Sequence, residues 1–191
     1  MSVRGYTTCE PDPGEDVISV PASAGHAAVF LDRDGVLIDD VGYPHREDQL
    51  AFVPGAAEAV RRLNTLGYLV VIVTNQSGVA RGMFSHGQME AFNDLIVRRL
   101  AAKGARIGAV YACPFHAEAV DPAWRHPDHP DRKPNPGMIN RAIADHGIDP
   151  RRAFMIGDRP SDMEAARRAG IPGFLFDGGN LDDFVRDLLA I

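Results

Sequence analysis

The sequence lacks the features of a membrane or disulfide-bonded protein. No apolar run approaches the roughly 20 residues that a helix needs to cross a bilayer. The first residues show no charged segment followed by an apolar one, which a secretory signal would have. The two cysteines, Cys9 and Cys113, are too few for a disulfide framework. We therefore expect a cytoplasmic protein without a membrane partner.

Positive charge is also scarce. Lys and Arg number 20 against 26 Asp and Glu, which gives a net charge of −6. No basic cluster offers a track for a phosphate backbone, so the sequence argues against nucleic-acid binding, and we expect no nucleic-acid partner. A small anionic ligand would have to be attracted by a local site, because the overall field of the protein opposes it.

The composition that remains is typical of a globular domain. The apolar fraction is 45%, and 191 residues are enough to bury one core. Residues 1–26 are rich in Pro, Gly, Ser and acidic residues and show no periodicity, which predicts a loose N-terminal extension. Residues 27–191 are predicted to form a single domain, and we expect a monomer.

From residue 27 onward, short apolar runs alternate with segments of helical periodicity. Strands are predicted at 27–31, 69–73, 107–112, 153–156 and 173–176, and helices at 57–66, 89–100, 138–146, 163–169 and after a cap at Asn180. This alternation predicts an α/β fold, a Rossmann-like three-layer sandwich with a central parallel sheet. The segments between these elements are too short for a large cap domain.

Polar residues follow three of the predicted strands. Asp32 and Asp34 follow the first strand, the segment 74–78 begins at the end of the second, and Asp158 opens a further polar segment, 158–162. In an open parallel sheet, ligands bind outside the carboxyl ends of the strands. We therefore expect these three segments to meet at one crevice.

The chemistry of the three segments favours phosphoryl transfer. The carboxylates of Asp32, Asp34 and Asp158 would repel one another unless a cation neutralised them, and Mg²⁺ prefers such hard oxygen ligands. A carboxylate can attack phosphorus, and a second one beside it can protonate the leaving oxygen and then activate water. Thr74 offers a hydroxyl to the phosphoryl oxygens, and Lys133 offers the cation for the developing charge.

Each of these motifs taken alone has an ordinary structural interpretation. An Asp-x-Asp-Gly segment is as often a turn as a catalytic motif, and a single lysine is most often a solvated surface charge. The order and spacing of all of them together favour the catalytic interpretation.

With these residues the chain resembles the haloacid dehalogenase superfamily of phosphatases. The superfamily motifs correspond to Asp32-x-Asp34-Gly35, Thr74, Lys133, and Asp158 with Asp162. Within the superfamily, the chain is similar to the branch of heptose bisphosphate and histidinol phosphatases. Longer strings carry this similarity: Phe30 to Gly35, Gly42-Tyr43, Val73 to Gly82 and Arg132 to Met138.

This resemblance implies roles for individual residues. Asp32 is implied as the nucleophile and Asp34 as the acid/base, with Asp32, Asp158 and the backbone carbonyl of Asp34 as magnesium ligands. Substrate contacts are implied for Asp40, Gly42, Tyr43, Thr74, Asn75, Gln76, Ser77, Arg132 and Arg159. Arg132 next to Lys133 suits a second anionic group on the substrate.

One departure from the branch concerns a zinc site. Where relatives carry zinc ligands, this chain has Cys113, Phe115, His129 and Asp131, and Phe115 cannot bind a metal. His116 could replace it in a quartet of zinc-competent side chains. We nevertheless expect no tightly bound structural zinc, because the donor would move by one residue and a thiolate position is taken by Asp131.

The expected function is therefore a Mg²⁺-dependent phosphatase for a small phosphorylated metabolite, a heptose bisphosphate attacked at its C7 phosphate. Two alternatives remain open at this point. A histidinol-phosphate phosphatase would use the same catalytic residues. A non-catalytic domain that binds a phosphorylated ligand is disfavoured, since it has no need of an acid/base at Asp34.

Overall fold

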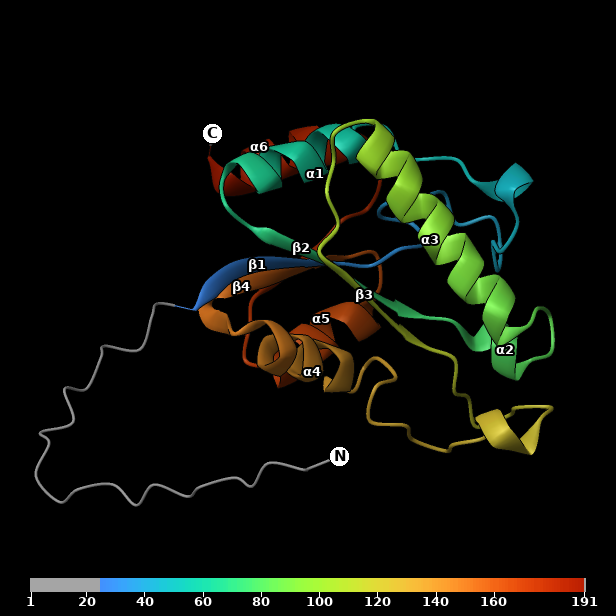
Figure 1. Ribbon diagram of the computed structural model, residues 1–191. Coiled ribbons are helices and arrows are strands. Elements are labelled where there is room, and N and C mark those ends of the chain that lie inside the picture. The colour runs from blue at the N-terminus through green and yellow to red at the C-terminus, as the bar shows by residue number, and fades with distance from the viewer. Residues whose placement is uncertain (1–24, 191) are drawn as a thin grey trace, which may run out of the picture.

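The computed structural model describes residues 25–190, which form a parallel sheet with helices on both faces (Figure 1). The strands of this region are β1 (His26–Leu31), β2 (Leu69–Asn75), β3 (Ala109–Cys113), β4 (Ile148–Gly157) and β5 (Gly173–Leu175). All their pairings are parallel, and the strand order is β3-β2-β1-β4-β5. The predicted fold class is confirmed. The predicted extension at 1–26 lies outside the described residues, apart from its last two.

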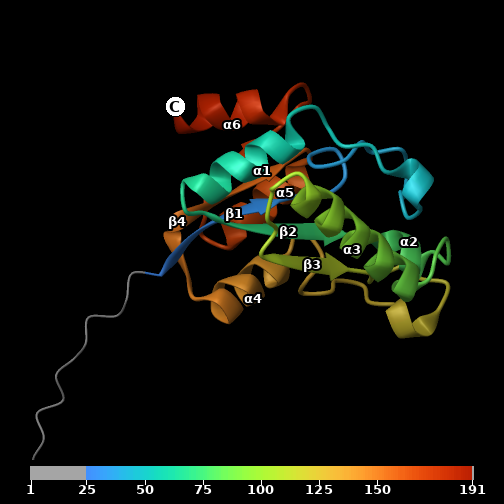
Figure 2. The ribbon, with the colours of Figure 1, turned by 45° about the horizontal axis from the view of Figure 1, so that its top comes forward.

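Two helical layers enclose this sheet. The helices are α1 (Ala56–Thr65), α2 (Ser77–Ala80), α3 (His86–Ala102), α4 (Gly137–His146), α5 (Pro160–Arg168) and α6 (Leu181–Leu189), with single 3-10 turns η1 (Glu47–Gln49) and η2 (Pro122–Trp124). Helices α1, α3 and α6 cover one face, and α4 and α5 cover the other, as Figures 1 and 2 show. The segments that follow β1 and β3 hold only η1 and η2 as regular elements before the next helix, so no cap domain is inserted there.

The two sides of β1 face two different cores. Val29 and Leu31 pack in the cluster beneath α1, α3 and α6, whereas Ala28 and Phe30 pack in the cluster beneath α4 and α5. All four side chains are fully buried. Burial on both faces explains the unbroken apolar run in the sequence.

The predicted elements differ from the observed ones mainly at their ends. The third strand begins two residues later than predicted, and β4 begins at Ile148, because Ile148 pairs with His26 ahead of a register shift. Helix α2 was not predicted, since four residues that include Gly78 show no helical periodicity. The predicted cap is confirmed: the Asn180 side chain accepts hydrogen bonds from the N–H groups of Asp182 and Asp183. No helix within residues 25–190 is long and apolar enough to span a membrane.

The strand order places the polar segments together. Strand β1 lies between β2 and β4, and Leu31 pairs in register with Ile72 on one side and Ile156 on the other. The chain winds one way from β1 to β3 and the opposite way through β4 and β5. Such a reversal point opens a crevice at the carboxyl ends of the strands, where Asp32, Thr74 and Asp158 are found.

Candidate active site

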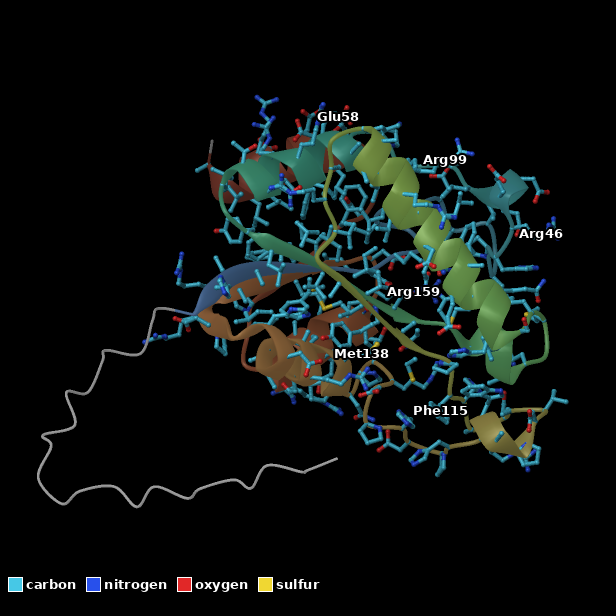
Figure 3. All side chains as sticks on the ribbon, viewed as in Figure 1. Arg46, Glu58, Arg99, Phe115, Met138 and Arg159 are labelled. Carbon is cyan, nitrogen blue, oxygen red and sulfur yellow. The ribbon has the colours of Figure 1, made fainter. Side chains whose placement is uncertain are left out.

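An open pocket of about 370 Å³ lies at this edge of the sheet. All of the site residues predicted from the sequence line it, except Asp158. Its walls are Asp32, Asp34, Asp40, Gly42, Tyr43, Thr74, Asn75, Gln76, Ser77, Arg132, Lys133, Arg159, Ser161 and Asp162. Arg159, labelled in Figure 3, follows β4 at the start of α5. The predicted convergence of segments that are distant in the sequence is therefore confirmed.

Lys133 forms the floor of this pocket between two carboxylates. Its Nζ lies 2.9 Å from Asp32 Oδ1 and 2.7 Å from Asp162 Oδ1, and it donates to the carbonyl oxygen of Val73 at 2.9 Å. The residue is only 4% exposed. Burial disfavours the charged ammonium, but the charges of Asp32 and Asp162 outweigh this effect and raise the pKa of Lys133. Lys133 is therefore a charged group held directly beside Asp32.

Three carboxylates form a compact cluster at the same place. Asp32, Asp158 and Asp162 each offer an oxygen, and these atoms lie within 4.8 Å of one another. Burial, and after it the charges of Asp32 and Asp162, raise the pKa of Asp158 to about 6. Within residues 25–190, Asp158 Oδ1 is buried and has no hydrogen-bond partner. An excess of negative charge with an unpartnered oxygen matches the donor set that a hard divalent cation prefers.

Gly35 keeps the space beside this cluster open. A Cβ atom at this position would lie 2.4 Å from Asp158 Oδ2, and the backbone φ of +82° is in the left-handed region that favours glycine. The glycine of the Asp-x-Asp-Gly motif is therefore required both by the turn and by the carboxylate of Asp158.

Asp34 is held beside Asp32 by two neighbouring side chains. Its Oδ1 accepts a hydrogen bond from Arg33 Nε at 2.9 Å, and its Oδ2 accepts from Arg33 Nη2 at 3.1 Å and from Gln76 Nε2 at 2.9 Å. Burial raises the pKa of Asp34 by more than the charge and hydrogen bonds of Arg33 lower it. A carboxyl group with a raised pKa at the pocket wall is suited to give and take a proton.

Two residues predicted to contact substrate use their side-chain amides within the protein. Gln76 Nε2 donates to Asp34 and to Thr74 Oγ1, and its Oε1 accepts from Arg33. Asn75 donates to the carbonyl oxygen of Lys133 and accepts from its N–H, at 2.9 and 3.0 Å. Both amides thus orient neighbours of the pocket. Since Thr74 Oγ1 is the acceptor in its bond with Gln76, its hydroxyl proton remains available for another acceptor.

The rim of the pocket carries a sharp turn and two arginines. Asp40 Oδ1 accepts from the N–H of Gly42 at 3.0 Å, and both Gly42 and Tyr43 have left-handed backbone conformations. Asp40 Oδ2 pairs with Arg159 at 2.7 Å, which joins this turn to the start of α5. Arg132 is half-buried and donates to the carbonyl oxygen of Phe115, and within residues 25–190 it forms no salt bridge.

The sequence reasoning gave no role to two charged residues of this site. Asp162 is fully buried in the first turn of α5, where it pairs with Lys133 and also accepts from the N–H of Arg159. Its position in the Asp158 motif was the available signal. Arg33 stands between the two motif aspartates, and no signal in the sequence showed that it is buried.

The side chains considered as zinc ligands contact protein groups. The ring of His129 stacks on Phe115, with centroids 4.0 Å apart, and its Nδ1 lies 3.9 Å from Cys113 Sγ. The same Nδ1 lies 3.1 Å from the N–H of Asp131, whose carboxylate pairs with Arg141 at 2.7 Å. Burial raises the pKa of Cys113 to about 11, which disfavours the thiolate that zinc requires.

The imidazole of His116, considered above as the substitute zinc ligand, contacts an arginine. Its Nε2 lies 3.3 Å from Arg81 Nη2. Phe115, labelled in Figure 3, also packs edge-on against Trp124, with ring centroids 5.5 Å apart. The absence of structural zinc stays a prediction.

Comparison with known proteins identifies the family. The family profile described as HAD-hydrolase-like matches residues 131–186. The D-glycero-beta-D-manno-heptose-1,7-bisphosphate 7-phosphatase of Rhodopseudomonas palustris is 47% identical over 163 residues, which span 85% of this chain and 89% of that protein.

Two solved structures extend this similarity to three dimensions. A HAD-like phosphatase from Mesorhizobium loti is 37% identical with a TM-score of 0.81, over 87% of this chain and 86% of that one. The D,D-heptose 1,7-bisphosphate phosphatase of B. bronchiseptica, complexed with magnesium and phosphate, is 33% identical with a TM-score of 0.69, over 86% of each chain. The chain belongs to the haloacid dehalogenase-like phosphatases, in the family of the heptose-1,7-bisphosphate 7-phosphatases.

Proposed function

We propose that this chain is a Mg²⁺-dependent phosphatase that removes the C7 phosphate of a heptose 1,7-bisphosphate through an aspartyl-phosphate on Asp32. The observation that carries the proposal is the arrangement of Asp32, Asp34 and Lys133 in one pocket. A buried ammonium lies 2.9 Å from the first carboxylate, and the second carboxyl group is fixed at the wall. The similarity to heptose bisphosphate phosphatases over most of the chain supports the substrate class.

Asp32 acts as the nucleophile in this proposal. Both the N–H of Arg33 and Lys133 Nζ contact its Oδ1, at 2.7 and 2.9 Å. Within residues 25–190, Oδ2 is not engaged in these contacts and is the oxygen we assign to the attack. It forms a bond to phosphorus while the bond from phosphorus to the sugar oxygen breaks. Thr74 and Lys133 stabilise the negative charge on the phosphoryl oxygens.

Asp34 transfers the protons. In the first half-reaction its carboxyl group gives a proton to the departing sugar oxygen, which would otherwise leave as an alkoxide. In the second, the resulting carboxylate takes a proton from water as the water oxygen attacks phosphorus. The bond between phosphorus and Asp32 then breaks, which releases inorganic phosphate and restores the carboxylate of Asp32 and the protonated carboxyl group of Asp34.

Mg²⁺ fits the acidic cluster next to these groups. Asp32, Asp158 and the backbone carbonyl of Asp34 would hold the ion. When bound, it would neutralise the carboxylates and the phosphate oxygens and so permit two anions to approach. The unpartnered Oδ1 of Asp158 and the space kept by Gly35 support this assignment. Asp162 is engaged by Lys133 and is assigned to orient that lysine.

The rim is assigned to the sugar and to its second phosphate. Asp40, Gly42, Tyr43, Ser77 and Arg159 line the pocket and are more exposed than Asp32 and Lys133. Arg132 is the arginine of this rim without a carboxylate partner among the described residues, so it is the group best placed to bind the distal phosphate. The cytoplasmic location and the monomeric state also belong to this proposal.

Phosphate release from a panel of esters tests the proposed function. The panel comprises heptose 1,7-bisphosphate, histidinol phosphate and common sugar monophosphates, each with Mg²⁺ and with EDTA. We expect Mg²⁺-dependent turnover that is fastest for the bisphosphate, and ³¹P NMR should identify heptose 1-phosphate as the product. A preference for histidinol phosphate would overturn the substrate assignment, and full activity in EDTA would overturn the role of the metal.

A further inference from the structure

The arginine between the two motif aspartates is completely buried. Arg33 has no exposed surface, and it follows a strand whose last residue, Leu31, faces the core beneath α1, α3 and α6. The guanidinium group reaches the same side of the sheet, where its carbon lies 5.2 Å from the centre of the Phe92 ring in α3. Burying a guanidinium group is unfavourable unless its N–H donors have hydrogen-bond partners. The partners of Arg33 therefore indicate what the side chain does in this protein.

The contacts of this guanidinium group link four segments of the chain. Nε and Nη2 form a fork on the two oxygens of Asp34, as described above. Nη1 donates to Asn93 Oδ1 in α3 at 2.8 Å, and Nη2 also contacts Gln76 Oε1 at 2.9 Å and the carbonyl oxygen of Pro44 at 3.1 Å. The segments are the turn after β1, the rim turn that ends at Pro44, the end of β2 and helix α3.

This network determines the orientation of the Asp34 carboxyl group. The terminal torsion of an aspartate has broad, two-fold preferences and does not by itself fix the plane of the carboxyl group. In this structure the fork from Arg33 fixes that plane, and Asn93 fixes the plane of the guanidinium group. Arg33 does not line the pocket, so its side chain acts on the reaction indirectly. Its direct route is the fork on Asp34, and a second, longer route runs through Gln76 to Thr74.

We infer that Arg33, anchored by Asn93, is a positioning residue that aims the proton-transferring carboxyl group of Asp34 at the leaving oxygen of the substrate. This inference rests on the proposed function. It means that position x of the Asp-x-Asp-Gly motif, which is Arg33 here, requires a planar side chain with two parallel N–H donors. It also means that Asn93 in α3, which lies outside the pocket, affects the proton transfer by holding Arg33.

Substitution Arg33→Lys separates this role from a general need for positive charge. A lysine keeps the charge next to Asp34, but its compact ammonium cannot form the fork and reach Asn93 at the same time. A misplacement of about 1 Å in a reacting group can cost about 10²-fold in rate. We therefore expect Arg33→Lys to slow steps that need the proton of Asp34 and to spare steps that do not.

Single-turnover measurements with two leaving groups provide the test. The rate of release of the sugar from a heptose phosphate requires protonation of an alkoxide, whereas p-nitrophenolate leaves p-nitrophenyl phosphate without it. For Arg33→Lys, sugar release should slow by about 10–10²-fold and nitrophenolate release by less than about threefold, with KM little changed. Asn93→Leu, which removes the outer anchor alone, should show the same selectivity with a smaller loss.

A double-mutant cycle and a matched arginine complete the experiment. In the background of Asp34→Asn, Arg33→Lys should cause little further loss of rate, because its effect passes through Asp34. Arg62 forms a similar fork on Asp182, with Nε and Nη2 each at 2.8 Å, between α1 and α6. Arg62→Lys should lower the melting temperature without changing the ratio of the two leaving-group rates.

The outcomes that would overturn the inference are distinct. Equal losses on both leaving groups, or losses that multiply with those of Asp34→Asn, would show that Arg33 does not act through Asp34. If Arg33→Lys fails to fold, Asn93→Leu decides the question by the same two criteria. A wild-type protein without activity on any phosphate ester would refute the proposed function, and this inference with it.

Discussion

Removal of the buried ammonium of Lys133 should lower the free energy of unfolding, because two carboxylates of the site lose their compensating charge. In Lys133→Met the ammonium that lies 2.9 Å from Asp32 and 2.7 Å from Asp162 is replaced by an apolar group of similar length. Both carboxylates then remain in the interior without their cation. Breaking a buried ion pair by removing one partner costs about 3–5 kcal/mol, so we expect the free energy of unfolding to fall by that amount near pH 8.

The loss of stability in Lys133→Met should depend on pH, and the environment of Asp162 determines the direction. Burial raises the pKa of Asp162 and the charge of Lys133 lowers it, with a net upward shift. Without Lys133 this pKa rises further, so the folded variant binds a proton that the unfolded chain releases. Its stability therefore increases as the pH falls, and the difference from wild type should narrow between about pH 8 and pH 5.

Urea denaturation of wild type and variant, monitored by circular dichroism, measures both effects. The matched control is Lys103→Met at the other lysine of the sequence, which is exposed. Its ammonium lies 5.3 Å from the centre of the Phe52 ring, so we expect the control to change the free energy of unfolding by no more than about 1 kcal/mol at either pH. If Lys133→Met were as mild as the control, or if its loss grew toward low pH, the assignment of Lys133 as the compensating charge would be refuted.

Three further predictions concern the chemistry, the substrate and the loop after β3. Asp34→Asn should lower steady-state turnover of a sugar phosphate by roughly 10²–10⁴-fold, and a loss of less than about tenfold would contradict its role as acid and base. Arg132→Ala should raise KM for the bisphosphate by the equivalent of about 1.5–3 kcal/mol and leave KM for a monophosphate nearly unchanged, whereas equal effects would remove Arg132 from the distal phosphate. Metal analysis of protein purified without chelator should find no zinc in the loop 113–131, and about one zinc per chain would show that His116 has become a ligand.

The architecture was largely predictable because its signals are local. Apolar runs such as Val29 to Leu31 identify strands that are buried on both faces, and the alternation with helices implies the parallel sheet. The position of the pocket followed from the rule for carboxyl ends of parallel strands, applied to Asp32, Thr74 and Asp158. Only local departures escaped this reasoning, such as helix α2 and the early start of β4 at Ile148.

Details of the site that depend on hydrogen-bond partners could not be predicted in this way. Nothing in the sequence shows that the amides of Asn75 and Gln76 bind groups of the protein, because their partners come from segments 42 to 58 residues away in the chain. The same holds for Arg33, whose partner Asn93 lies 60 residues further along the chain. Such pairings arise from tertiary packing, which the local pattern of a sequence does not encode.

The most direct test of the central claim compares wild type with Asp32→Asn. An amide cannot attack phosphorus, so the variant should release no phosphate from heptose 1,7-bisphosphate in the presence of Mg²⁺, while its circular dichroism spectrum shows a folded protein. Wild type, acid-quenched during turnover, should carry the phosphoryl group on the peptide that contains Asp32. Turnover by Asp32→Asn close to the wild-type rate, or a phosphoryl group found on another residue, would contradict the account.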